Sequence, residues 1–137
     1  MSTTRTVLFL CPHNAAKSVL AAVEFDRLAR ERGLPFRADT AGTEPAAMPS
    51  PAVVAALAGE GVDVSAHRPR RVTAADLASA AHVVSLGCDA GDLLPPNVAI
   101  ERWDDVPAAS SDLDASRAAI RRHVEVLVAE LPPSAEA

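Results

Sequence analysis

The chain has 137 residues and a mass of 14.2 kDa, and its 49% apolar and 23% charged residues are the composition of one globular domain. No apolar run approaches the roughly 20 residues of a membrane span, and the polar residues 1–5 do not resemble a signal peptide, so we expect a cytoplasmic protein with no membrane partner. The net charge is +2 on residues 1–71 and −7 on residues 72–137, which excludes an ordinary nucleic-acid-binding protein. Cys11 and Cys88 are too few and too far apart for a disulfide scaffold or a zinc knuckle.

Apolar periodicity predicts strands that alternate with helices. Residues 6–10 form a short apolar run typical of a strand buried on both faces, and a helical pattern follows from Ser18 to Arg32 with Gly33 as a stop. The other expected elements, in chain order, are a strand at 36–41, helices at 50–60 and 73–81, strands at 82–86 and 98–103, and a helix at 112–131. Flexible loops are expected at Pro95-Pro96 and 108–111.

This alternation predicts an α/β sandwich around a four-stranded parallel sheet, whose ligand site lies beyond the carboxyl ends of the strands. We expect a single domain over residues 1–137, with a flexible tail at 132–137 after the last helix.

The segment between the first strand and its helix, Cys11 to Ser18 (CPHNAAKS), lies at that edge. A loop that wraps into a helix N-terminus points several backbone N–H groups at one place, and the helix dipole adds positive potential, so a tetrahedral oxyanion is the expected ligand. The same field favours the thiolate form of Cys11, which would face the anion as a nucleophile. We expect Ser18 to hydrogen-bond the thiolate and Lys17 to bring a positive charge to the anion. The expected substrate-binding residues are Pro12, His13, Asn14, Ala15, Ala16, Lys17 and Ser18.

This loop resembles the active-site loop of the low-molecular-weight protein tyrosine phosphatases and of the arsenate reductases with the same fold, which carry a cysteine, five residues, an arginine, and a serine or threonine. The resemblance covers roughly residues 5–131 and implies a three-layer sandwich with a flavodoxin-like winding of the sheet. Later segments resemble family landmarks in the same order: Asp39–Thr43, Gly61–Ser65 with His67, Val83–Leu86 and Trp103–Pro107.

Within the family, the sequence His13-Asn14-Ala15 is more similar to the reductase loops, and Cys88 lies where reductases often have a second cysteine. Family phosphatases usually place tyrosines after the catalytic aspartate, whereas this chain has no tyrosine. The resemblance therefore implies a thiol-dependent arsenate reductase with Cys11 as the nucleophile and Asp105 as the general acid. Cys88 is either a resolving thiol or a structural residue.

Three positions depart from the family pattern. Lys17 stands where the family has arginine and is the one lysine among 13 basic side chains; an ammonium is a point charge, whereas a guanidinium grips two oxygens at once. Asp104 is an alternative acid, because the family has aspartate directly before proline and this chain has Val106 in between. Ala22 stands where thioredoxin-coupled reductases carry a glutamate associated with potassium, and His13 is expected to shape the loop, so we predict no metal site.

We expect no bound cofactor. Arsenate or phosphate would be the oxyanion, and the reductant would be an external thiol, either a low-molecular-weight thiol or a redoxin of the glutaredoxin, mycoredoxin or thioredoxin type. Two cysteines are too few for the three-cysteine relay of thioredoxin-coupled members. Two alternatives remain open: a phosphatase that hydrolyses a phosphocysteine, and a non-catalytic oxyanion-binding or redox-sensing module.

Overall fold

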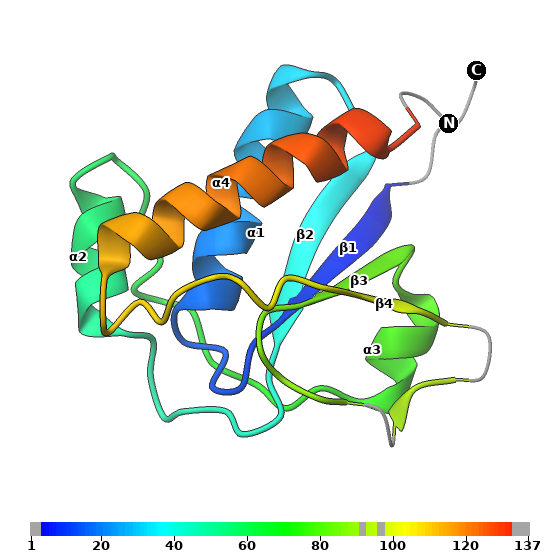
Figure 1. Ribbon diagram of the computed structural model, residues 1–137, viewed down its shortest axis with the longest axis horizontal. Helices are drawn as coiled ribbons and strands as arrows, with labels where there is room; N and C mark the ends of the chain where they lie inside the picture. Colours follow the sequence, from blue (N-terminus) through cyan, green and yellow to red (C-terminus); the bar gives the residue numbers. More distant parts are fainter. Residues whose placement is uncertain (1–3, 91–92, 96–97, 133–137) are drawn as a thin grey trace.

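A computed structural model describes residues 4–90, 93–95 and 98–132 (Figure 1). Its elements in chain order are β1 (Arg5–Leu10), α1 (Lys17–Glu31), β2 (Phe36–Ala41), α2 (Pro51–Ala58), α3 (Ala74–Ser79), β3 (His82–Ser85), β4 (Ile100–Arg102) and α4 (Leu113–Glu130). The elements expected from apolar periodicity agree with these in type and order. Pro96 and residues 133–137, within the expected loop and tail, lie outside the described residues.

The four strands form one sheet in the order β2-β1-β3-β4, and every neighbouring pair is parallel. The predicted fold class, an α/β sandwich with a four-stranded parallel sheet, is therefore confirmed. Leu10 of β1 lies in register with Ala41 of β2 and Ser85 of β3. The segments that follow these three residues consequently meet at one edge of the sheet.

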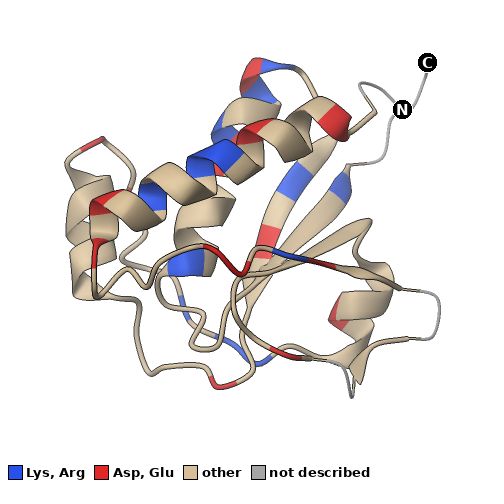
Figure 2. Cartoon of the chain, viewed as in Figure 1, with Lys and Arg blue, Asp and Glu red and all other residues tan. Residues whose placement is uncertain are grey.

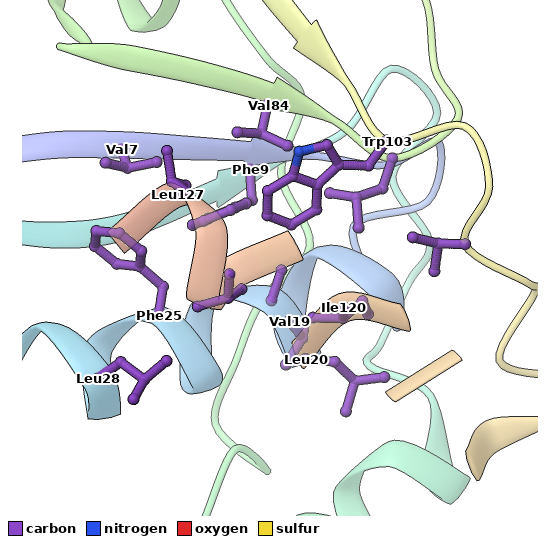
Figure 3. Packing of buried hydrophobic residues seen from close by; sticks show 14 of the residues in the cluster. Val7, Phe9, Val19, Leu20, Phe25, Leu28, Val84, Trp103, Ile120 and Leu127 are labelled. Atoms are coloured by element: carbon purple, nitrogen blue, oxygen red, sulfur yellow. The ribbon is translucent and has the colours of Figure 1, made fainter. Parts of the chain in front are cut away.

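The alternation of side chains along β1 divides the core into two clusters. Val7 and Phe9 pack on the face covered by α1 and α4, whereas Leu8 and Leu10 pack on the face covered by α3 (Figure 1). The ring of Phe9 lies 5.7 Å from the rings of both Phe25 and Trp103, so aromatic side chains occupy the centre of the first cluster (Figure 3). This packing fixes α1, and with it the loop that precedes α1.

The helices differ in how their first turns are satisfied. Thr73 closes a capping box on α3, and the Asp112 side chain accepts a hydrogen bond from the backbone N–H of Ala115 in α4. The N-cap of α1 is Ala16, which has no side-chain acceptor. The Ala16 side chain therefore satisfies none of the first N–H groups of α1, and the N–H of Ser18 is directed at the Cys11 sulfur. Among the helices of the described residues, none combines the length and apolar character needed to cross a bilayer.

Candidate active site

Cys11 directly follows β1 and lines a cleft of about 430 Å³ at the carboxyl edge of the sheet, which we call the Cys11 cleft. The cleft is bounded by the loop, by the segment before α2 and by the segment before α4. Its lining residues are Cys11, Pro12, His13, Ala15, Ala16, Lys17, Ala46, Met48, Pro49, Ser50, Pro51, Ala108, Ala109 and Ser110. Five residues of the predicted binding loop and the predicted nucleophile thus share one cavity wall.

The hydroxyl and the backbone N–H of Ser18 both lie within hydrogen-bonding distance of the Cys11 sulfur. Cys11 Sγ lies 3.1 Å from Ser18 Oγ and accepts a hydrogen bond from the Ser18 backbone N–H at 3.4 Å. Asn14 Nδ2 donates to the same Ser18 oxygen at 2.9 Å, which leaves the hydroxyl hydrogen free to point at the sulfur. With the thiol protonated, Cys11 donates to Ser18 Oγ; in the thiolate form, the Ser18 hydroxyl and backbone N–H can both donate to the sulfur and stabilise its negative charge.

Asn14 holds the loop in shape. Its side chain is fully buried and its backbone has a φ of +52°, a left-handed conformation that asparagine tolerates better than most residues. Asn14 Oδ1 accepts a hydrogen bond from the Arg70 backbone N–H at 3.0 Å, and the Asn14 carbonyl accepts one from His67 Nε2 at 2.8 Å. The Asn14 side chain, expected to bind substrate, is thus engaged in positioning the loop. His67 was singled out in the sequence only as part of a family-like segment, and nothing in the sequence pointed to this role of His67 or Arg70.

Gly42 allows the loop to pack directly on the end of β2. A Cβ at Gly42 would lie 2.7 Å from the Pro12 carbonyl oxygen and 2.8 Å from the Cys11 carbonyl oxygen. The backbone N–H of Glu44 also donates to the Pro12 carbonyl at 2.7 Å. The segment containing Gly42 was singled out in the sequence as a landmark, and its close approach to the loop is what requires the glycine.

Lys17 is the first residue of α1 and lines the Cys11 cleft. Its Nζ atom lies near Gly87, because a Cβ at Gly87 would be only 3.2 Å from Nζ. Gly87 has a φ of +95°, a conformation that other residues rarely adopt. The ammonium therefore sits between the cleft and the turn after β3, beside the uncapped start of α1.

Cys88 lies on the other face of the sheet from Cys11. Cys11 belongs to the cluster under α1 and α4, and Cys88 to the cluster under α3. Burial raises the pKa of the Cys88 thiol, against a hydrogen bond from Ser85, and the nearby charge of Cys11 raises it further. Both cysteines are free and buried, and they belong to different core clusters.

The two candidate acids are held outside the cleft. The connection between β4 and α4 carries acidic residues (Figure 2). Asp104 accepts a hydrogen bond from Arg102 Nε at 3.1 Å, and Asp105 Oδ1 lies 2.7 Å from His123 Nε2 of α4. The hydrogen bond with His123 lowers the pKa of Asp105. Neither aspartate is among the described residues that line the Cys11 cleft.

Metal-binding side chains do not gather at this site. Within the described part of the chain, no group of three or more His, Cys, Asp or Glu side chains is placed to hold a metal ion. Ala22, the position compared with the potassium-associated glutamate, lies in α1.

Comparisons with known proteins identify the family of this chain. The sequence model of the family described as low molecular weight phosphotyrosine protein phosphatase matches residues 6–127. The chain is 31% identical over 97 residues, 69% of this chain and 68% of the relative, to a Halobacterium salinarum protein provisionally named arsenate reductase. The chain therefore belongs to the low-molecular-weight phosphatase and arsenate reductase family, whose members are typically enzymes.

Two solved structures have a similar fold. YfkJ from Bacillus subtilis has a TM-score of 0.78 and 23% identity, with 93% of this chain and 94% of that chain covered. The thioredoxin-dependent arsenate reductase of Corynebacterium glutamicum has a TM-score of 0.74 and 26% identity, with 92% of this chain and 61% of that chain covered.

Proposed function

We propose that this protein is an arsenate reductase that works through a Cys11 thiolate. The observation that carries the proposal is the position of Cys11 Sγ in the wall of the cleft, with two donors from Ser18 and with Lys17 beside the uncapped start of α1. This arrangement combines a nucleophile, an anion-binding helix start and a positive charge.

In the first step, the Cys11 sulfur attacks the arsenic atom of bound arsenate. A sulfur–arsenic bond forms, one arsenic–oxygen bond breaks, and the oxygen leaves as water after it receives a proton. Lys17 and the N–H groups of the loop balance the charge of the remaining oxygens.

In the second step, the thiolate of a second thiol attacks the Cys11 sulfur of this adduct. A disulfide forms, and the electron pair of the sulfur–arsenic bond remains on arsenic. Arsenic is thereby reduced from As(V) to As(III) and leaves as arsenite, while the two sulfurs supply the two electrons. A reductant then reopens the disulfide.

The second thiol comes from Cys88 or from an external donor. Burial of Cys88 on the other face of the sheet, and its raised pKa, favour an external thiol as the first attacker. A low-molecular-weight thiol or a redoxin would serve, and the Corynebacterium glutamicum neighbour is a thioredoxin-dependent enzyme.

Asp105 is the general acid that the sequence predicts for the first step. Asp105 does not line the cleft and its Oδ1 lies 2.7 Å from His123 Nε2, so its carboxyl must move to the cleft before it can protonate the departing oxygen. Asp104 would likewise have to leave Arg102.

A phosphatase is the second candidate function. Phosphate has the tetrahedral shape and charge of arsenate, and hydrolysis of a phosphocysteine by water needs no second thiol. The burial of Cys88 in the cluster under α3 is compatible with this reaction.

The test is an assay of the purified protein with arsenate and a panel of thiol donors, with arsenite as the measured product. We expect arsenite to form only when a thiol donor is present, and not with Cys11→Ser. Hydrolysis of p-nitrophenyl phosphate without thiol and without arsenate reduction would favour the phosphatase. Oxyanion binding with neither activity would favour the non-catalytic module.

A further inference from the structure

The Cys11 cleft lacks a carboxylate where the chemistry requires a proton donor. The departing oxygen must receive a proton, because hydroxide or oxide is a poor leaving group. Of the described residues that line the cleft, Cys11, His13 and Lys17 are the ionisable ones. The segment before α4, which faces the cleft, contributes only Ala108, Ala109 and Ser110.

Asp105 is anchored away from the cleft by a rigid set of contacts. Its partner His123 stacks on the Trp103 ring at 4.7 Å between centroids and 12° between planes. Trp103 is itself buried, and its Nε1 donates to Glu101 Oε2 at 2.6 Å, which fixes the stack. The lowered pKa of Asp105 leaves its carboxyl ionised near neutral pH, without a proton to give.

His13 has a fixed backbone and an uncommitted ring. Its carbonyl accepts a hydrogen bond from the Ala46 N–H at 3.0 Å, and the neighbouring Asn14 is held on both its side chain and its carbonyl. His13 lines the cleft, and its ring has no hydrogen-bond partner among the described residues. Imidazole is the side chain suited to exchanging a proton near neutral pH.

We propose that His13, rather than Asp105, donates the proton to the departing oxygen. This inference rests on the proposed arsenate reductase function. The imidazolium N–H passes its proton to the oxygen of the breaking arsenic–oxygen bond, and the oxygen leaves as water. The neutral imidazole then takes the proton of the incoming thiol, which generates the thiolate for the second step and restores the imidazolium.

Lys17 is less suited to this transfer. Its ammonium balances the charge of the oxyanion, and loss of its proton would remove that charge at the moment it is needed. The other ionisable residues that line the cleft with His13 are Cys11 and Lys17, and Glu44 lies in the segment whose backbone is bonded to the loop at Pro12.

The test compares His13→Gln with the wild type in steady-state arsenate reduction over a range of pH. We expect kcat to fall by about 100-fold or more with KM nearly unchanged, and the loss of rate at high pH that belongs to an acid to disappear. His82→Gln is the matched control, because His82 lies at the start of β3 outside the Cys11 cleft. It should keep the wild-type rate and pH profile.

A second variant separates proton transfer from loop structure. In His13→Ala, free imidazole added to the buffer should restore part of the lost rate, which a purely structural defect would not allow. The proposal is wrong if His13→Gln keeps wild-type kcat, or if the loss of rate at high pH persists in His13→Gln and disappears in Asp105→Asn. If the wild type reduces no arsenate with any thiol donor, the proposed function itself fails and this inference fails with it.

Discussion

At the scale of single residues, the loop combines features that the sequence predicted with one that it could not. The sequence predicted that Cys11, Ser18 and Lys17 lie together, because they share one strand–loop–helix segment, and Cys11 stays the candidate nucleophile. The position of Asp105 was not predictable, because its hydrogen bond to His123 joins residues 18 positions apart and depends on how α4 packs. The assignment of the acid therefore stays a prediction for experiment.

Lys17 is the residue where this chain departs most clearly from its family, and replacement should reveal what the ammonium does. Lys17→Ala removes a charge-assisted contact worth roughly 1.5 to 3 kcal/mol, so we expect kcat/KM for arsenate to fall by about 10- to 150-fold. Lys17→Arg should also lower kcat/KM, because Nζ already lies against Gly87 and a longer planar group has little room there. A several-fold gain with Lys17→Arg would contradict this view of the loop.

The two cysteines should differ in reactivity. Burial raises the pKa of Cys88, whereas Cys11 faces the cleft with two hydrogen-bond donors on its sulfur. We expect iodoacetamide near pH 6 to label Cys11 first, as measured by mass spectrometry of the digested protein. Faster labelling of Cys88 under the same conditions would mean that the nucleophile has been assigned to the wrong cysteine.

Cys88→Ser tests the source of the second thiol. We expect this variant to retain arsenate reduction when a small thiol is supplied, because the donor can reach the cleft while Cys88 lies on the opposite face. Complete loss of reduction in a folded Cys88→Ser protein would assign resolution to Cys88. The control is the rate of arsenate reduction by the wild-type protein with the same thiol donor.

At the scale of elements, periodicity was sufficient to predict every helix and strand of the described chain, with ends that differ by at most two residues. Short apolar runs and helix-stop glycines are local signals, so they can be read along the chain. The contacts that support the loop are not local. They join Gly42 after β2, and His67 and Arg70 before α3, to the loop before α1. Only the register of the parallel sheet brings these segments together.

Gly42→Ala tests the close packing of Gly42 against the loop. The added Cβ would lie closer to two loop carbonyl oxygens than Cβ atoms normally approach, so we expect a loss of about 1–3 kcal/mol in stability and a large fall in activity. Gly59→Ala is the matched control. Gly59 is the C-cap of α2 with a helical φ of −63°, and an added Cβ would lie 3.5 Å from the nearest carbonyl oxygen, which is an ordinary contact. This variant should keep a melting temperature and an activity near those of the wild type. Equal melting temperatures and activities for the two variants would show that the close approach does not matter.

At the scale of the whole molecule, ion pairs connect distant parts of the fold. Arg70 pairs with Asp39 of β2 at 3.0 Å and with Asp76 of α3 at 2.9 Å, while its backbone N–H holds Asn14. Stability and the shape of the loop are thus linked through one residue.

Asp76 should make the stability depend on acid pH. Burial favours the neutral form of Asp76, but hydrogen bonds from Arg70 and Thr73 outweigh it, so the pKa of Asp76 in the folded state is lowered. A lowered folded pKa gives stability that is present above the unfolded value, about 3.9, and is lost as pH falls through the folded pKa. We expect the free energy of unfolding, measured with urea, to fall below about pH 4.

Asp76→Asn isolates this contribution. The variant should be less stable than the wild type near pH 6, and the difference should shrink as the pH falls through the folded pKa of Asp76, below which the carboxyl is protonated in both states. A difference that stays the same size over this whole range would mean that the ion pair is not the source of the pH dependence.

The most direct measurement of the proposed chemistry is a single turnover with less than one equivalent of arsenate and a small thiol, followed by quantification of arsenite and mass spectrometry of the cysteine-containing peptides. We expect one arsenite for each arsenate consumed and an equal amount of Cys11 converted to a disulfide, with neither product in Cys11→Ser. Arsenite formation with Cys11 still a free thiol, or undiminished formation in Cys11→Ser, would contradict a reaction through Cys11.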